Sequence, residues 1–444
     1  MNSGQKAFGL WSAVFLGIGS MVGAGIFIVI GQAGAIAGSL VWLSFVFGGL
    51  AALLSGYSLA KLAVAYPSRG GIVEYLVQGY GEGMFSGSTG VLFYFSQLIA
   101  IAAVAKSFGA YASTFMPGLS HSQDIFASGI VVLFITINLI GAALVAKSEN
   151  IIVSIKLTIL ISFTAVALFY IEPSLLSMSE TPPMKDMLFA VGLTFFAYQG
   201  FSVITNTVED MKEPKKNMMP AILTAIALVG VLYILTSLAV LGNLPLEKVI
   251  AAKDYALAAA AKPIFGEWGF KIMAATALLA TASAINATLY AATEIGYTLA
   301  KDGDLPKVYT YNVYSSYSGL VISGILILPM IIFLNLSQVV TIAALVVLII
   351  QGLTHVGHYL RIKETGASRV LVLGAIVGMF GISALMLYHT SQKEMPLIGL
   401  YILGTFALSF AVEFVLRLGK TRVIKKQTDE NMIEKIENEL KKIL

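Results

Sequence analysis

The chain has 444 residues, of which 57% are hydrophobic and only 12% are charged, and its formal net charge is +4. A soluble globular chain carries about 25% charged residues, so this composition indicates an integral membrane protein and excludes a soluble one. The chain has no cysteine, which excludes disulfides and thiolate metal sites.

Twelve apolar segments are predicted to cross the membrane. In chain order they cover about residues 8–35, 40–66, 84–114, 125–145, 147–170, 184–208, 218–241, 268–300, 318–335, 337–360, 368–389 and 395–418. An even number of spans places both termini on one side. Of the 28 Lys and Arg residues, twenty fall in the loops and tails on that side and six in the opposite loops. Because short loops rich in positive charge stay in the cytoplasm, we expect a cell-membrane protein with both termini cytoplasmic.

The first segment carries Gly17, Gly19, Gly23 and Gly25 in the middle of an apolar run that is too long for a signal peptide. In hydrocarbon every backbone N–H and C=O must be bonded within the protein. A helix break at mid-membrane is therefore tolerated only where it lines a cavity or grips a ligand. We expect a discontinuous helix and a binding site here. The alternative is that these glycines only allow close helix packing.

Shorter features are expected outside the spans. Residues 70–78 have apolar side chains at i, i+3 and i+4, which predicts a short cytoplasmic helix along the membrane interface. Residues 245–262 predict a longer outer segment that is helical by composition. From Gly419 onward the chain is charged, with apolar residues at helical spacing, and is predicted to form an amphipathic cytoplasmic tail.

Lys156 lies in the fifth segment, nine residues after Lys147 and so roughly 14 Å along a helix, close to mid-membrane. A cation at the centre of a span costs at least about 2.5 to 3.5 kcal/mol, so its presence requires a reason. Burial disfavours the charged form of an amine, and such a lysine can exchange a proton during a transport cycle. The alternative is an ammonium that only pins helices through backbone carbonyls.

The sixth segment carries a second break, where aromatic residues, Gln199 and Gly200 lie near its middle. If segments one to five and six to ten are two repeats, the interrupted segments one and six occupy corresponding positions. That pattern is typical of a transporter's binding site. Sequence identity between the halves is not detectable, so the repeat inference rests on the breaks and on the number of segments. As in the first segment, the alternative is that the glycine only allows close helix packing.

Three blocks of sequence resemble a known family. Trp11 followed by the glycine-rich stretch 19–27 resembles the first-helix motif of the amino acid–polyamine–organocation (APC) superfamily. Residues 213–217 with the Pro-Ala-Ile that begins at residue 220, and residues 284–290 with 299–306, agree with this likeness, which extends over roughly residues 8–418. Within the superfamily the chain most resembles the ApcT-type proton-coupled amino acid transporters, because of Lys156.

The resemblance implies an all-α integral membrane fold of the LeuT type. This fold is a 5+5 inverted repeat with twelve transmembrane helices, of which helices 1 and 6 are discontinuous. A transporter domain would cover residues 1–418, with repeat one at about 8–170, repeat two at about 184–360 and additional helices at about 368–418. Residues 419–444 would form the cytoplasmic tail.

The resemblance also implies a substrate site between helices 1 and 6. A half-helix N-terminus suits a carboxylate and a half-helix C-terminus suits an ammonium, so the two breaks fit a zwitterionic amino acid. Backbone amides of residues 23–25 are the expected carboxylate donors, and carbonyls of residues 20, 21, 196 and 199 are the expected ammonium acceptors. The predicted substrate-binding residues are Ser20, Met21, Gly23, Ala24, Gly25, Phe196 and Gln199, where Phe196 resembles an aromatic gate.

The expected proton-coupling residues follow from the same resemblance. By this resemblance Lys156 would occupy the place where sodium binds in other members of this fold, and its ammonium is expected near the carbonyl of Gly19 and the hydroxyl of Ser283. Protonated Lys156 would link helix 1 to segments five and eight, and deprotonation would loosen the link.

Other ionisable residues fall within apolar segments. Lys106 is expected to reach toward the outer surface with its long side chain. Glu294 is either a carboxylate of the cytoplasmic pathway or half of an ion pair. His355 and His358 have the spacing of a metal pair but lack a third ligand, so no metal site is predicted.

The leading functional prediction is proton-coupled uptake, or symport, of a broad range of L-amino acids by alternating access. Neutral substrates are favoured because no Asp or Glu is clearly available at the site. The proton is the coupling ion and no cofactor is expected. An amino acid exchanger in which Lys156 is structural is the first alternative, and a transporter-like sensor or complex subunit is the second. The expected partners are the amino acid and the lipid bilayer, with no nucleic acid and no obligate protein partner. No paired catalytic groups are visible, so an enzyme is not predicted.

Overall fold

The computed structural model describes residues 9–419, apart from residues 69, 117, 120, 141–142, 178–182 and 393–396. The predicted tail beyond Gly419 therefore lies outside the described residues. Within them the chain is almost entirely helical, and ten helices are long and apolar enough to cross a membrane. A two-stranded antiparallel hairpin, β1 (Asn312–Val313) with β2 (Ser316–Tyr317), interrupts this pattern.

The helices of the first half follow the predicted segments closely. They are α1 (Leu10–Ala37), η1 (Gly38–Leu40), α2 (Val41–Ala65), α3 (Ile72–Tyr80), α4 (Met84–Ser113), α5 (Ser122–Ile140), α6 (Ala143–Ala167), η2 (Leu168–Tyr170) and η3 (Pro173–Leu176), where η marks 3₁₀ helices.

The second half begins with α7 and contains the longest helix of the described chain. Its elements are α7 (Met184–Tyr198), η5 (Gln199–Thr207), α8 (Pro214–Asn243), α9 (Leu246–Ala251), α10 (Ala256–Asp302), η6 (Lys307–Thr310), α11 (Ser318–Phe333), α12 (Leu336–Leu360), α13 (Ile362–Thr365), α14 (Arg369–Gln392) and α15 (Leu397–Gly419). The predicted outer segment 245–262 is not one helix. It divides into α9 and the first turns of α10, which bends at Gly266, where φ is 65°.

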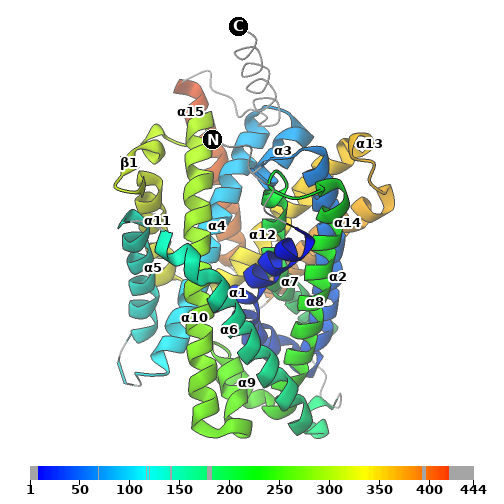
Figure 1. Ribbon diagram of the computed structural model, residues 1–444, viewed down its shortest axis with the longest axis vertical. Helices are drawn as coiled ribbons and strands as arrows, with labels where there is room; N and C mark the ends of the chain where they lie inside the picture. The colour runs from blue at the N-terminus through cyan, green and yellow to red at the C-terminus, as the bar shows by residue number, and fades with distance from the viewer. Residues whose placement is uncertain are drawn as a thin grey trace.

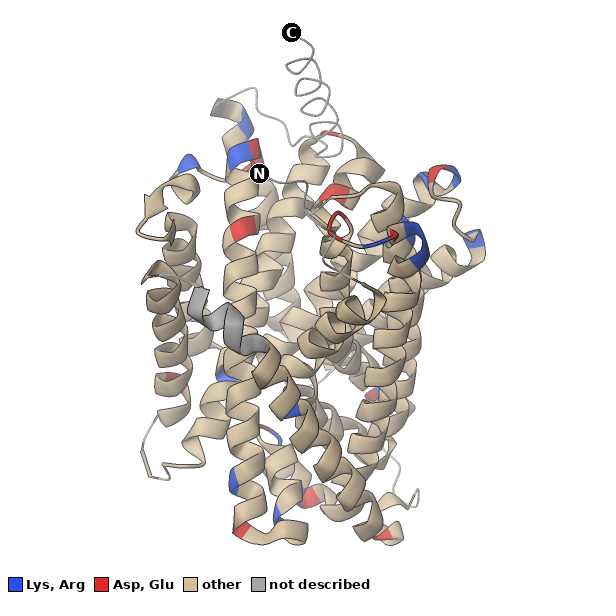
Figure 2. Cartoon of the chain, viewed as in Figure 1, with Lys and Arg blue, Asp and Glu red and all other residues tan. Residues whose placement is uncertain are grey.

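The long helices form a bundle along the long axis of the molecule (Figure 1). The most apolar stretches of α4 and α12 are each 83% buried, whereas those of α5 and α15 are 22% buried. Large apolar side chains stay exposed on the outer helices, among them Leu133, Val377 and Leu403. Charged residues gather toward the two ends of the bundle and are sparse between them (Figure 2). This distribution fits an apolar solvent around the middle of the bundle.

The expectation of an unwound first helix is wrong for this structure. α1 is a single α-helix from Leu10 to Ala37. Its glycines instead face close neighbours: a Cβ on Gly25 would lie 2.4 Å from the Ala197 oxygen, and one on Gly31 would lie 2.0 Å from the Lys253 oxygen. The missing side chains therefore let other elements approach α1, which is the alternative explanation of the same sequence pattern.

The second predicted break is visible as a change of helix type. The α-helix α7 ends at Tyr198, and residues 199–207 continue as the 3₁₀ helix η5. Runs of 3₁₀ helix longer than three or four residues are uncommon, and within a longer helix they often mark a hinge or a strained stretch. The sixth segment is thus altered near Gln199, as the sequence indicated. The twelve-helix inverted repeat stays a prediction.

The short helix α3 is buried in the protein and does not present an open apolar face. All of its residues from Ile72 to Gly79 are buried, and it packs against α4 and α12. Two of its polar side chains pair with each other there, since Gln78 Nε2 donates to Glu74 Oε1 at 2.8 Å. The amphipathic pattern therefore reflects contact with protein rather than with lipid headgroups.

Candidate functional site

The α1 helix meets α7 and η5 at a point where glycines face each other's backbones. A Cβ on Gly25 would lie 3.0 Å from the Ala197 Cα, and one on Gly200 would lie 2.6 Å from the backbone nitrogen of Met21. The same position on Gly200 would lie 2.7 Å from the Ser20 Oγ. The first and sixth predicted segments therefore meet at this point, and only glycine at positions 25 and 200 permits this distance.

Tyr233 on α8 joins the two elements at this crossing. Its hydroxyl lies 2.7 Å from the Met21 oxygen and 3.3 Å from the Ala197 oxygen, and the side chain is fully buried. Sequence reasoning missed this residue. The available signal was a tyrosine within the apolar run of α8, because a phenol buried in an apolar region normally finds a hydrogen-bond partner.

Lys156 on α6 contacts α1 closer to the N-terminus of that helix, at Gly19. Its Nζ donates to the Gly19 oxygen at 2.9 Å, and the residue is 1% exposed. A Cβ on Gly23 would lie 3.6 Å from this Nζ and 3.2 Å from the Ala284 Cβ on α10. Ser283, the residue before Ala284, is 4% exposed. The ammonium thus lies where α1, α6 and α10 meet.

Two other predicted substrate residues lie along α7 and η5. Phe196 is 8% exposed, near the end of α7. Gln199 is half-buried at the start of η5, and its Oε1 accepts a hydrogen bond from Gln351 Nε2 on α12 at 2.7 Å. Gln351 was not singled out from the sequence, since a lone glutamine in an apolar helix carries no motif.

The predicted carboxylate donors are not open in this structure. An α-helix uses its N–H groups on carbonyls four residues earlier. Because α1 is continuous, the amides of Gly23, Ala24 and Gly25 lie within its hydrogen-bonded ladder. Their use for a ligand would require local unwinding. The side chain of Ala24 lies outside the described part of the structure.

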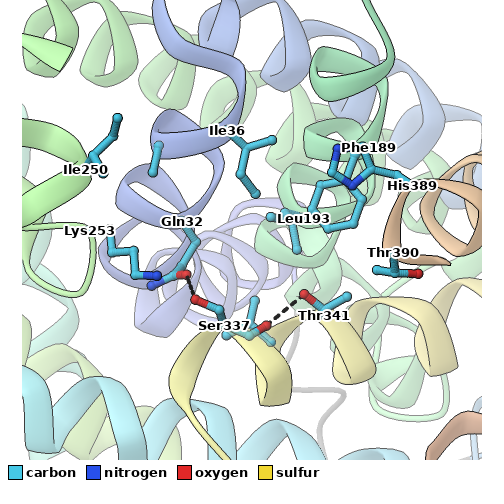
Figure 3. A pocket seen from close by; sticks show the side chains of 12 residues that line it. Gln32, Ile36, Phe189, Leu193, Ile250, Lys253, Ser337, Thr341, His389 and Thr390 are labelled. Atoms are coloured by element: carbon cyan, nitrogen blue, oxygen red, sulfur yellow. Dashed lines mark hydrogen bonds between the residues drawn. The ribbon is translucent and has the colours of Figure 1, made fainter. Parts of the chain in front are cut away.

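A cavity of about 540 Å³ lies toward the other end of α1 (Figure 3). Ser337 Oγ donates to Gln32 Oε1 at 2.6 Å on one side, and the ring of Phe189 stacks on His389 at 4.3 Å on the other. Gln32 is eleven residues beyond Met21, roughly 16 Å along the helix. The cavity is lined by parts of α1 and α7 beyond the contact between Gly25 and Ala197, and the described residues that line it include none of the predicted substrate-binding residues.

Glu294 is an exposed residue on α10. No described residue forms an ion pair with it, so the structure does not place it in the paired arrangement that was one of its two interpretations. Its role in a cytoplasmic pathway stays a prediction.

Lys106 does not reach toward solvent as expected. It is 4% exposed, and its Nζ donates to Asp124 Oδ1 at 2.6 Å and to the Ile331 oxygen at 2.7 Å. The carboxylate lies on α5, at the far side of the connection from α4. A buried cation needs such a partner, and Asp124 supplies it here.

We expect Asp124→Asn to lower the melting temperature of the purified protein. Removing one partner of a buried ion pair costs about 3 to 5 kcal/mol, and a smaller loss is expected here because the Asp124 side chain is 32% exposed. The double variant Lys106→Met with Asp124→Asn should recover most of the stability, because no unpaired charge remains. A double variant no more stable than Asp124→Asn would show that the ion pair does not account for the loss.

Comparison with known proteins identifies several relatives. A family model described as "Amino acid permease" matches residues 8–415. The inner membrane transport protein YbaT of Escherichia coli K12 is 35% identical over 425 residues, which cover 95% of this chain and 98% of the relative. The branched-chain amino acid permease BcaP of Bacillus subtilis is 25% identical over 332 residues, 69% of this chain and 70% of the relative. A cadaverine/lysine antiporter of Escherichia coli K12 is 25% identical over 313 residues, with the same two coverages of 69% and 70%.

Proposed function

Because this chain belongs to the amino acid permease family, we propose that it is a secondary transporter that couples the uptake of neutral L-amino acids to protons. Family membership and the multi-pass helical fold make it a membrane transporter rather than an enzyme. The direction of coupling, the substrate range and the cytoplasmic position of both termini are parts of the proposal.

The substrate site is proposed at the crossing of α1 with α7 and η5. Glycine-to-backbone contacts at Gly25 and Gly200 support this choice, because they bring the backbones of both elements to the crossing. Opening of α1 near Gly23 would free amide donors for a carboxylate, and the carbonyls near Met21 would accept from an ammonium. The same opening of α1 would alter the hydrogen bond from Tyr233 to the Met21 oxygen.

The proposed coupling rests on one observation above all, the hydrogen bond from Lys156 Nζ to the Gly19 oxygen. A protonated amine donates to this carbonyl and holds α1 against α6. A deprotonated amine loses its charge and with it about half of the strength of the bond, since charge-assisted hydrogen bonds are roughly twice as strong as neutral ones. Proton release would therefore weaken the contact between α1 and α6 at Gly19, two residues before Met21 of the proposed substrate site.

The side chains at the crossing favour neutral substrates. Those named there are Ser20, Met21, Phe196, Gln199 and Tyr233, and none is a carboxylate that could pair with a cationic side chain. The relative that is named as a branched-chain amino acid permease is consistent with this range.

Exchange of one amino acid for another is the second candidate function. It is favoured by the relative named as a cadaverine/lysine antiporter. In that case Lys156 would stabilise the packing of α1 without exchanging a proton during the cycle. The two functions differ in what drives accumulation: a proton gradient for a symporter, and internal substrate for an exchanger.

A competition panel in proteoliposomes tests the proposal. Twenty unlabelled amino acids compete with labelled L-leucine, with and without an inward proton gradient. We expect the gradient alone to drive accumulation above the external concentration, and neutral amino acids to compete. Uptake that requires preloaded amino acid and ignores the gradient would identify an exchanger. Absence of uptake under both conditions, in protein that retains its melting transition, would contradict transport of neutral amino acids such as L-leucine.

A further inference from the structure

A chain of buried hydrogen bonds runs from Gln199 into the contact between α2 and α12. Gln351 Nε2 donates to Gln199 Oε1 at 2.7 Å, and Ser55 Oγ donates to Gln351 Oε1 at 2.5 Å. The next link joins His355 Nε2 to Ser55 Oγ at 2.9 Å. Ser55, Gln351 and His355 are each 0% exposed. Three fully buried side chains are therefore connected by hydrogen bonds to the half-buried carboxamide of Gln199 at the start of η5.

The direction of each bond is fixed by the number of hydrogens available. Ser55 has one hydroxyl hydrogen, which it gives to Gln351, so the bond with His355 must use the hydrogen on His355 Nε2. The opposite ring nitrogen, Nδ1, is buried without a partner and holds only a lone pair in this tautomer. Every donor in the chain therefore points toward Gln199, whose Oε1 is the last acceptor.

Gln199 is left with its amide nitrogen as the uncommitted polar group. No described residue forms a hydrogen bond with its Nε2. The adjacent Gly200 packs directly on the Ser20 and Met21 backbone, so this carboxamide lies next to the crossing of α1 and η5. A glutamine free to rotate could present either an oxygen or an NH₂ group, whereas this one is held with its oxygen occupied.

We propose that Ser55 and Gln351 are positioning residues that hold Gln199 so that its Nε2 donates to the carboxylate of the substrate. The inference rests on the proposed substrate site and adds to it a hydrogen-bond donor that does not depend on unwinding of α1. It also specifies the substrate group at this position. The amide N–H groups of Gln199 donate hydrogen bonds and accept none, so the substrate group that contacts Nε2 must carry an oxygen acceptor.

The same pair of helices supplies a matched control. Ser58 and His358, one turn further along α2 and α12, form a second buried pair with 2.7 Å between Oγ and Nδ1. His358 Nε2 continues to Thr365 Oγ1 at 2.8 Å, away from Gln199. Both pairs are a serine on α2 facing a histidine on α12, but only the pair at Ser55 is connected to the proposed site.

The test compares Ser55→Ala with Ser58→Ala in proteoliposomes, using L-leucine as substrate and L-leucinol, which lacks the carboxylate, as competitor. Loss of one hydrogen bond to a charged group should raise the KM of Ser55→Ala for L-leucine about tenfold, with kcat little changed. The inhibition constant of L-leucinol should stay at the wild-type value. Ser58→Ala should leave both unchanged, and Ser55→Thr, which keeps the hydroxyl, should restore the KM for L-leucine.

Three outcomes would overturn the assignment: an unchanged KM in Ser55→Ala, an equal rise in Ser58→Ala, or an equal weakening of L-leucinol. Melting temperatures measured on each variant separate these results from misfolding. If Ser55→Ala does not fold, Gln351→Met removes the donor to Gln199 directly and should give the same selective change. A wild-type protein that takes up no amino acid would refute the proposed function itself, a result distinct from wild-type uptake with an unaltered Ser55→Ala.

Discussion

Replacing Lys156 with alanine is expected to abolish the accumulation of amino acid driven by an imposed proton gradient. The ammonium of Lys156 donates to the Gly19 oxygen at 2.9 Å in a fully buried position. An alanine side chain carries no exchangeable proton and cannot form this hydrogen bond. In proteoliposomes with an inward proton gradient, the internal concentration of labelled L-leucine should therefore rise no higher than the external one. Exchange against preloaded L-leucine should persist if the variant still binds substrate.

The other buried lysine provides the control for this experiment. Lys106 pairs with Asp124 and with a carbonyl of α11, so its ammonium is held by α5 and α11. The double variant Lys106→Met with Asp124→Asn should still accumulate L-leucine in response to the gradient. Accumulation by Lys156→Ala at the wild-type level would contradict a coupling role and leave Lys156 as a packing residue.

Gly25→Ala is expected to eliminate transport and to lower stability. The added methyl would lie 2.4 Å from the Ala197 oxygen and 2.7 Å from the Tyr233 hydroxyl, so α1 and α7 must separate. Overpacking of this kind costs about 1 to 3 kcal/mol, and separation would also break the hydrogen bond between Tyr233 and Met21. Uptake of L-leucine and the melting temperature of the purified protein measure the two effects.

Gly378→Ala is the matched control for this substitution. Gly378 also lies within a long helix, α14, but a Cβ there would meet no atom within 4 Å. Uptake should be unchanged and stability equal or slightly higher, because alanine favours helix over glycine by about 1 kcal/mol. If Gly25→Ala behaved like Gly378→Ala, close approach at the crossing would not matter for transport.

The helices could be predicted from sequence because their signal is local. A long apolar run has few alternatives to a helix in hydrocarbon, and each of the twelve predicted segments overlaps a helix in the described chain. The change at Gln199 was also visible, since a glutamine and a glycine interrupt an apolar run. Lys156 stood out because a cation at that depth is costly.

The features that were missed depend on contacts between distant parts of the chain. Glycine lacks a Cβ whether a helix unwinds or a neighbour packs closely, so the pattern around Gly25 cannot distinguish the two. Lys106 meets Asp124 only because α4 and α5 pack together. Likewise, no spacing rule connects Tyr233 to Met21, which lie in different halves of the chain. These contacts required the tertiary structure.

The burial of α3 has a mechanical consequence. At one end, a Cβ on Gly71 would lie 2.4 Å from the Asn206 side chain in η5, and at the other, one on Gly79 would lie 2.5 Å from the Gly357 Cα in α12. Tyr80 adds a hydrogen bond to the Leu353 oxygen at 2.7 Å. The helix therefore connects η5 to α12 through contacts at both of its ends. Any displacement of η5 relative to α12 would have to break the contact at Gly71 or those at Gly79 and Tyr80.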